Sequence, residues 1–265
     1  MLPEVSQLSL THRAVAAVGP AVTRFAVGDE VYGVARGSFA EYAVAHEDKL
    51  GRKPTNLSFE QAAVVPVSGL VAQRGLVDVG RLRAGQKVLI TGASGGVGSY
   101  AVQLAKALGA EVTAVASTSK TDLVRSLGAD HVVDYTREDF ADGTRHYELI
   151  LDIAGNPSLA RLRRALTPHG TLVVLGGEQG GSITGGFGRT LRAPLLSRFV
   201  SQRLAMVTAD ENGRDLERLT ALIEAEQSTP HVDRAYPLEQ VQEAMARLVA
   251  GDVRGKVALT VQPPP

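Results

Sequence analysis

Short runs of apolar, largely β-branched residues recur through the middle of the chain. These runs occupy residues 87–91, 111–118, 131–133, 149–151 and 172–175. Helical patterns follow the first two runs, at 96–108 and 121–127, and Gly109 and Gly128 can end them. Near-continuous apolar strands are typical of a parallel sheet that is buried on both faces. The pattern therefore predicts an α/β fold with a doubly wound parallel sheet and right-handed crossovers.

The region before this sheet has a different pattern. Residues 14–50 show short strands separated by turns and no helical period. Ser58 and Gln61 have the spacing of a capping box, which predicts a short helix that ends before Pro66. A second helix is predicted over 67–77.

The region after the sheet returns to helix and strand. Two amphipathic helices and a last strand are predicted at 216–223, 241–248 and 256–261. We predict two domains. Residues 70–209 form the parallel α/β domain, and residues 1–69 together with 210–265 form a second domain that is rich in β-structure.

The composition of the chain excludes several kinds of binding partner and several kinds of catalytic chemistry. The 28 basic and 28 acidic residues give a formal net charge of zero, so we expect neither nucleic acid nor a membrane as partner. The absence of cysteine excludes disulfides, thiol catalysis and thiolate-bound zinc, and the six histidines lack the spacing of a zinc site. There is no apolar run of about 18 residues and no signal-like start. We therefore expect a cytoplasmic protein without a metal site.

A glycine-rich turn joins the first predicted strand of the sheet to its helix. Residues 92–98 read GASGGVG, with Gly92 placed for a tight turn and Gly98 for close packing of helix and strand. A helix N-terminus has unpaired N–H groups and a partial positive charge, so it binds a pyrophosphate without a basic side chain. The cofactor-binding residues predicted here are Ser94, Gly95, Gly96 and Val97.

Two other interpretations of this turn remain open. The glycines could serve only to pack a strand against a helix. Residues 92–96 also match G-x-S-x-G, the nucleophile elbow of α/β-hydrolases. In that case Ser94 would be the nucleophile, with Asp152 and either His169 or His231 completing a triad.

The end of the next predicted strand indicates which dinucleotide is bound. A site for NAD would place an acid on the ribose about 20 residues beyond the last glycine. The chain instead has Ser117, Thr118, Ser119 and Lys120 there. Hydroxyls and an amine suit the 2′-phosphate of NADP(H), which carries about −1.5 to −2 charges. The alternative is that Ser119 caps a helix and Lys120 is a solvated residue of its first turn.

Taken together, these residues resemble the zinc-free, quinone oxidoreductase-like branch of the medium-chain dehydrogenase/reductase superfamily. Nearly the whole chain after about residue 14 takes part in the resemblance. The matching stretches are residues 17–19, 22–25, 27–33, 39–42, 54–60, 85–90, 92–98, 127–130, 134–135 and 255–257. The lack of cysteine agrees with the zinc-free branch.

The resemblance implies a fold and a set of site residues. It implies a Rossmann domain and a GroES-like, β-rich catalytic lobe to which the chain returns near its end. It further implies that Lys120 and Tyr135 hold the adenosine 2′-phosphate. The residues implied to line the ribose and nicotinamide are Asp152, Gly155, Gly176 and Gly177.

The start of the chain departs from the family pattern. Only 13 residues precede the match at Ala14, and residues 9–14 (SLTHRA) stand where the family has a glycine-containing run. We therefore expect an N-terminally truncated member with a partial GroES-like lobe. Missing strands would leave sheet edges and apolar surface uncovered, and a homodimer is one way to cover them. Val71, where relatives often have threonine, is a smaller departure.

These observations lead to one functional hypothesis and one alternative. The chain is expected to be an NADPH-dependent oxidoreductase that transfers hydride to a quinone, an enone or a similar activated carbonyl compound without a metal. No catalytic residue is assigned; Lys256 and Ser68 would approach the nicotinamide by family analogy, or be structural. The alternative is a non-catalytic NADP(H)-binding protein that lacks a complete substrate site.

Overall fold

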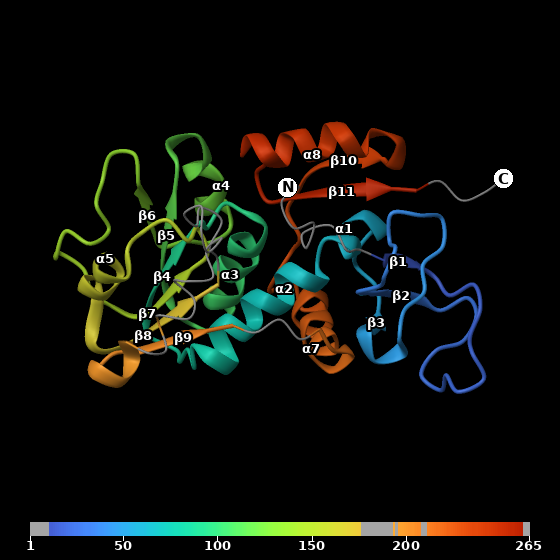
Figure 1. Ribbon diagram of the computed structural model, residues 1–265, viewed down its shortest axis with the longest axis horizontal. Helices are drawn as coiled ribbons and strands as arrows, with labels where there is room; N and C mark the ends of the chain where they lie inside the picture. Colours follow the sequence, from blue (N-terminus) through green and yellow to red (C-terminus); the bar gives the residue numbers. More distant parts are fainter. Residues whose placement is uncertain (1–10, 176–192, 194–195, 208–210, 262–265) are drawn as a thin grey trace. The chain divides into compact units, whose positions relative to one another are not determined.

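The computed structural model describes residues 11–175, 193, 196–207 and 211–261. The chain divides into two compact units, which are described separately below (Figure 1). The first unit comprises residues 1–70 and 210–265, and the second comprises residues 71–209. Within the described ranges, no helix is long and apolar enough to cross a membrane.

The second unit is built on a six-stranded sheet in which every neighbouring pair of strands is parallel. Its strands are β4 (Lys87–Thr91), β5 (Glu111–Ala116), β6 (His131–Asp134), β7 (Tyr147–Asp152), β8 (Leu166–Val174) and β9 (Arg203–Met206). The spatial order is β6-β5-β4-β7-β8-β9. This order confirms the predicted α/β fold with a parallel sheet. The five strands expected from the sequence are present, and β9 is an addition to them.

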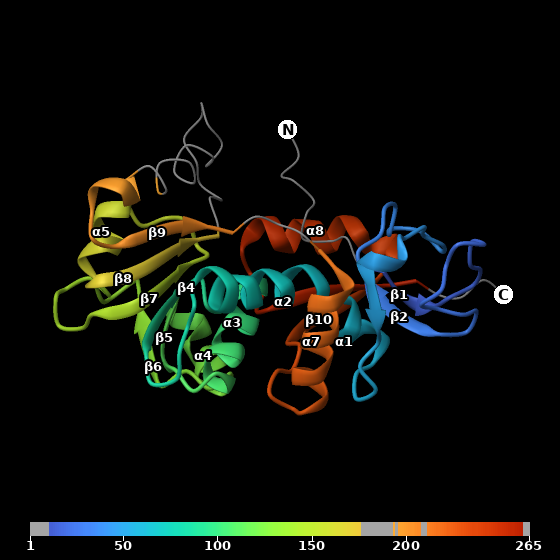
Figure 2. The same ribbon diagram turned by 90° about the horizontal axis from the view of Figure 1, so that it is seen from below.

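The helices of this unit cover both faces of the sheet. Among the residues that the structure describes they include α3 (Gly96–Ala107), α4 (Thr121–Ser126) and α5 (Leu159–Arg164), with 3₁₀ turns η3 (Thr118–Lys120) and η4 (Ser197–Phe199). From β4 the chain continues to β5, toward one end of the strand order. From β7 it continues to β8, toward the other end. Right-handed crossovers therefore place α3 and α5 on opposite faces (Figure 2).

Burial on both faces explains the apolar strand pattern. Successive residues point to opposite faces of a strand, yet Leu89 and Ile90 in β4 are both fully buried, as are Ile150 and Leu151 in β7. A strand covered by helices on both sides has no solvent-facing positions at its centre.

The first unit contains two small sheets. A three-stranded antiparallel sheet has the order β1-β2-β3, and a parallel pair is formed by β10 and β11. These strands are β1 (Thr11–Ala14), β2 (Glu30–Gly33), β3 (Leu50–Arg52), β10 (Val232–Pro237) and β11 (Lys256–Thr260). The short strands expected within 14–50 and the final strand are confirmed, while β10 was not expected.

Helices join and cover these strands. They are α1 (Phe59–Ala63), α7 (Gly213–Glu224) and α8 (Val241–Ala250), with 3₁₀ turns η1 (Glu47–Lys49) and η5 (Leu238–Gln240). The capping box is confirmed, since the Ser58 hydroxyl accepts from the Gln61 N–H at 3.2 Å and the Gln61 side chain accepts from the Ser58 N–H at 3.0 Å. The second helix expected over 67–77 is α2 (Pro66–Gln73), which continues as a π-helical segment, η2 (Arg74–Val79). The boundary between the units falls within α2, so η2 belongs to the second unit.

One buried tyrosine connects parts of the first unit that are far apart in the sequence. Tyr32 of β2 is fully buried. Its hydroxyl donates to the Leu216 carbonyl of α7 at 2.8 Å, and it lies 2.8 Å from the Thr220 hydroxyl. Burial raises the pKa of Tyr32 well above its ordinary value, so the hydroxyl stays neutral and remains a donor.

Candidate functional site

The residues singled out in the sequence gather at one edge of the parallel sheet. Ser94 to Val97 follow β4, Ser117 to Lys120 follow β5, and Tyr135 follows β6. Asp152 is the last residue of β7, and Gly155 lies shortly after it. Because all six strands are parallel, these positions share the carboxyl-terminal edge. Gly176 and Gly177 lie outside the described residues.

The strand order gives this edge a topological switch point. β4 and β7 are neighbours, with Thr91 opposite Asp152, and the chain leaves them in opposite directions across the sheet. Ligands of open α/β sheets bind at such a switch point, outside the carboxyl ends of the strands. The glycine turn after β4 lies at this switch point.

The glycine turn presents the start of α3 to solvent. Gly92 has φ of +66°, in the left-handed region, and the Gly92 carbonyl accepts from the Gly95 N–H at 3.1 Å. Gly95 is the N-cap of α3 and has no side chain that could satisfy the first helical N–H groups. The residues Gly95, Gly96 and Val97 are half-exposed, whereas Ser94 is buried. The N–H groups of Gly96 and Val97 have no partner within the helix, so these half-exposed residues offer donors at a positive helix end.

Gly98 sets how closely α3 approaches the turn. A Cβ atom at this position would lie 2.6 Å from the Ala93 Cα and still closer to the Gly92 carbonyl oxygen. Both neighbours are backbone atoms, so the clash could be relieved only by moving the helix or the strand. At Gly95, by contrast, the nearest atom to an added Cβ would be the Gly92 oxygen at 3.4 Å.

Asp152 supports the loop after β7 from within the protein. The side chain is fully buried, and its Oδ1 accepts from the Thr91 hydroxyl at 2.8 Å. The Thr91 oxygen in turn accepts from the N–H groups of Ile153 and Ala154 at 3.1 and 3.3 Å. The carboxylate therefore fixes the backbone at the switch point and does not face outward. Gly155 follows with φ of +71° and is half-buried.

The segment after β5 carries the polar side chains expected for a 2′-phosphate. Residues 118–120 form η3, and the Ser117 and Ser119 hydroxyl oxygens are 3.4 Å apart. Lys120 is half-buried, and Tyr135 is 59% exposed. Helix α4 has Lys120 as its N-cap and no side-chain cap bond, so Ser119 does not cap it. The interpretation of Ser119 as a helix cap is therefore wrong.

An acid that sequence analysis missed lies beside this segment. Asp134, the last residue of β6, is only 7% exposed. Its Oδ2 accepts from the Thr118 hydroxyl, and its Oδ1 accepts from the Thr136 hydroxyl at 2.7 Å and from the Thr136 N–H at 3.0 Å. These hydrogen bonds hold the pKa of Asp134 below its ordinary value. Its place at a strand end was readable from the sequence, but its threonine partners were not.

The hydrolase interpretation fails for His169. This histidine lies near the amino-terminal end of β8, between Leu166, which is opposite Tyr147, and Thr171, which is opposite Leu149. Ser94 follows the carboxyl-terminal end of β4. The two side chains are therefore at opposite edges of the sheet, whereas a triad requires them in hydrogen-bond contact.

In the first unit, Lys256 and Ser68 form a buried pair. The Lys256 Nζ donates to the Ser68 hydroxyl at 3.1 Å, and the two residues are 5% and 3% exposed. Burial lowers the pKa of Lys256 to about 8 because an ammonium group loses hydration inside the protein. Lys256 and Ser68, which the family analogy placed near the nicotinamide, are thus in contact with each other.

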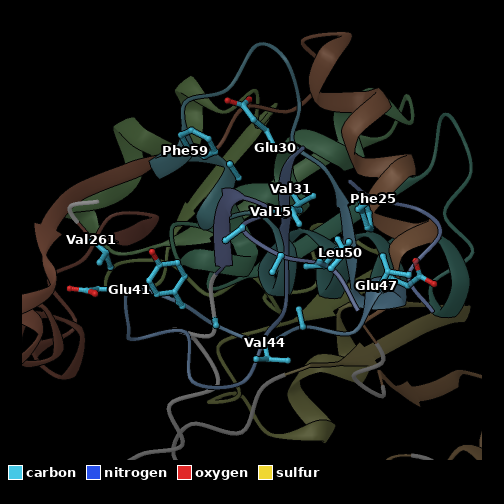
Figure 3. Close-up of a pocket in the computed structure, with 18 of the residues that line it drawn as sticks. Val15, Phe25, Glu30, Val31, Glu41, Val44, Glu47, Leu50, Phe59 and Val261 are labelled. Carbon is cyan, nitrogen blue, oxygen red and sulfur yellow. The ribbon is translucent and has the colours of Figure 1, made fainter. Parts of the chain in front are cut away.

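The first unit also contains an apolar cavity of about 820 Å³ (Figure 3). Val15, Val31, Leu50 and Phe59 are among its lining residues. Its charged lining residues are all acidic, namely Glu30, Glu41, Glu47 and Glu60. The volume is within the usual range of about 300–1,000 Å³ for small-molecule sites. None of the predicted cofactor-binding residues lines it.

Comparison with known proteins places this architecture in a family. The strand order 3-2-1-4-5-6, counted from β4 as the first strand, is that of the Rossmann fold. The sequence profile of a family described as zinc-binding dehydrogenase matches residues 127–259. The chain belongs to the medium-chain dehydrogenase/reductase superfamily, in its quinone oxidoreductase-like branch, which confirms the resemblance seen in the sequence.

Individual relatives agree with this placement. The chain is 37% identical over 266 residues to polyketide synthase GfsB of Streptomyces halstedii, covering 94% of this chain and 4% of that protein. It is 35% identical to the chloroplastic NADPH-dependent alkenal/one oxidoreductase of Arabidopsis thaliana, covering 92% of this chain and 61% of that protein. The quinone oxidoreductase of Coxiella burnetii has a similar structure, with a TM-score of 0.84, 28% identity and coverage of 95% and 78%. The chain thus spans only part of each relative's length.

The first prediction concerns packing at the glycine turn. Gly98→Ala should lower the free energy of unfolding by about 1–3 kcal/mol, because its methyl group meets backbone atoms that cannot move independently. Gly95→Ala is the matched control in the same turn and should cost less than about 1 kcal/mol. Urea denaturation monitored by circular dichroism measures both values. Equal costs would show that Gly98 does not set the approach of α3.

The second prediction concerns Lys256. Its pKa is about 8 in the folded state and 10.5 as the ordinary value, so the unfolded chain binds more protons between these pH values and stability rises with pH across that window. Lys256→Met should therefore stabilise the protein by about 1–3 kcal/mol at pH 7, where the buried ammonium is charged. The gain should shrink as the pH approaches 10.5. Urea titrations at several pH values test this, and a gain that does not vary with pH contradicts it.

Proposed function

We propose that the chain is an oxidoreductase that uses NADPH to reduce a quinone, an enone or a similar activated carbonyl compound without a metal. The observation that carries the proposal is the set of accessible N–H groups at the start of α3, placed at the switch point of a Rossmann sheet. The names of two relatives support it, since one is an NADPH-dependent alkenal/one oxidoreductase and the other a quinone oxidoreductase.

The residues at the sheet edge fit a dinucleotide. The N–H groups of Gly96 and Val97, at the start of α3, would hold the pyrophosphate. The half-exposed backbone of Gly95 has no Cβ and would allow the phosphates to come close. The polar side chains proposed for the adenosine end are Ser117, Thr118, Lys120 and Tyr135. Gly155, Gly176 and Gly177 are proposed for the ribose and nicotinamide.

Residues beneath the surface would keep this edge in place. The hydrogen bond between Thr91 and Asp152 holds the N–H groups of Ile153 and Ala154. Since Asp152 is fully buried, we propose that it positions the backbone rather than touching the ribose. Positioning of two reactants is the main contribution that a protein makes to hydride transfer.

The proposed chemistry needs few side chains. NADPH, when bound, supplies the hydride. A carbonyl-conjugated acceptor takes hydride without a metal because the negative charge that develops is delocalised onto oxygen. Water or a nearby donor then provides the proton. We assign no catalytic residue.

Zinc does not fit the groups that the chain offers. The name of the matching family implies zinc, yet the sequence has no cysteine. Among the residues that the structure describes, no three His, Asp or Glu side chains are grouped closely enough to hold a metal ion. We therefore propose a zinc-independent mechanism and derive no step through a metal.

A direct assay tests the function. NADPH should bind the full chain, and its absorbance should decay steadily with at least one member of a panel of quinones and enones. Tight NADPH binding without oxidation of any panel member would contradict the enzyme proposal and favour a protein that only binds the nucleotide. Absence of binding by either NADPH or NADH would contradict the site itself.

The choice of cofactor is tested by charge reversal. Lys120→Glu should weaken NADPH binding by at least about tenfold more than NADH binding, because a carboxylate would repel the 2′-phosphate at close range. Lys87→Glu makes the same charge change at the exposed amino-terminal end of β4 and serves as the control. Isothermal titration calorimetry gives the four dissociation constants. Equal losses for both dinucleotides would show that Lys120 does not face the 2′-phosphate.

A further inference from the structure

The hydrogen bonds around Asp134 restrict what the neighbouring hydroxyls can do. An ionised carboxylate can only accept hydrogen bonds, and a threonine hydroxyl has a single hydrogen to donate. Thr118 and Thr136 therefore both turn their hydrogens toward Asp134. The two hydroxyl oxygens are also 3.1 Å apart, but the contacts to the carboxylate are shorter.

This arrangement leaves Thr118 without a hydrogen for a phosphate. A phosphate group is an acceptor and requires donors, whereas Thr118 has only lone pairs left to offer. A ribose 2′-hydroxyl, by contrast, can donate to such an oxygen. Ser117, Ser119 and Lys120 remain the donors of this segment for a phosphate.

Asp134 also places a fixed negative charge beside the same segment. Its carboxylate is 90% buried, so water screens it less than it would screen an exposed carboxylate. Arg137 lies 3.7 Å from Oδ2 but is 72% exposed, so it compensates this charge only in part. A doubly charged phosphate near Thr118 would be repelled, and a neutral ribose hydroxyl would not.

We propose, on the basis of the function proposed above, that Asp134 is a specificity-determining residue that limits the preference of this site for NADPH over NADH. It acts in two ways, by holding the Thr118 hydroxyl as an acceptor and by keeping a negative charge at the adenosine end. The site then retains use of NADH despite the cation at Lys120.

The isosteric variant Asp134→Asn tests this role. A carboxamide has one oxygen and one NH₂ group, so it cannot accept from both threonine hydroxyls through two oxygens. If its NH₂ donates to Thr118, the Thr118 hydrogen becomes available to a phosphate. The ratio of the dissociation constant for NADH to that for NADPH should rise about three- to tenfold. A ratio that stays the same or falls would overturn the proposal.

Asp142→Asn is the matched control. Asp142 makes the same kind of local bonds, since its Oδ1 accepts from the Thr144 N–H at 2.8 Å and from the Thr144 hydroxyl at 2.7 Å. It lies in the loop that leads to the amino-terminal end of β7, away from the carboxyl edge. The same loss of charge there should leave the ratio unchanged, and an equal rise would overturn the specific role of Asp134.

Thr118→Val provides a second, independent test. The valine removes an acceptor for a ribose 2′-hydroxyl but no donor to a phosphate, so NADH binding should weaken at least as much as NADPH binding. A selective loss of NADPH binding would show that Thr118 donates to the phosphate and would overturn the proposal. If the unaltered chain binds neither dinucleotide, the proposed function fails together with this inference. If it binds both and the Asp134→Asn ratio is unchanged, only this inference fails.

Discussion

Unpaired backbone N–H groups at the start of α3 are the feature on which the rest of the site depends. A helix of 12 residues brings a partial positive charge to its first turn, and Gly95 provides no side chain to neutralise it. The left-handed conformation of Gly92 turns the chain out of β4, and the missing Cβ of Gly98 lets the helix begin against that turn. The strand order then places this helix end at the switch point between β4 and β7.

Two buried carboxylates hold the loops at this edge of the sheet in place. Asp152 and Asp134 each end a parallel strand, and each accepts hydrogen bonds from threonine hydroxyls. Burying a carboxylate without partners is very costly, so these bonds fix both the carboxylates and the loops that carry the threonines. Neither carboxylate faces outward. The edge thus presents backbone donors, hydroxyls and an amine to a ligand, with the negative charges held just beneath.

The sequence predicted the parts of the fold that depend on local pattern. Apolar strands, the Ser58 capping box and the glycine turn are encoded over a few residues and were found where expected. β9 was missed because its four residues, which include Arg203, make too short an apolar run. The burial of Asp152 and the partners of Asp134 were missed because both depend on how neighbouring strands align. Thr91 and Asp152 are 61 residues apart, and no local pattern relates them.

A crystal structure of the full chain with NADPH would show directly whether the pyrophosphate binds at the start of α3. The pyrophosphate oxygens should lie within hydrogen-bond distance of the N–H groups of Gly96 or Val97. The adenosine phosphate should lie near Lys120. A structure in which NADPH is bound elsewhere, with no phosphate at the start of α3, would contradict the site assigned to the pyrophosphate.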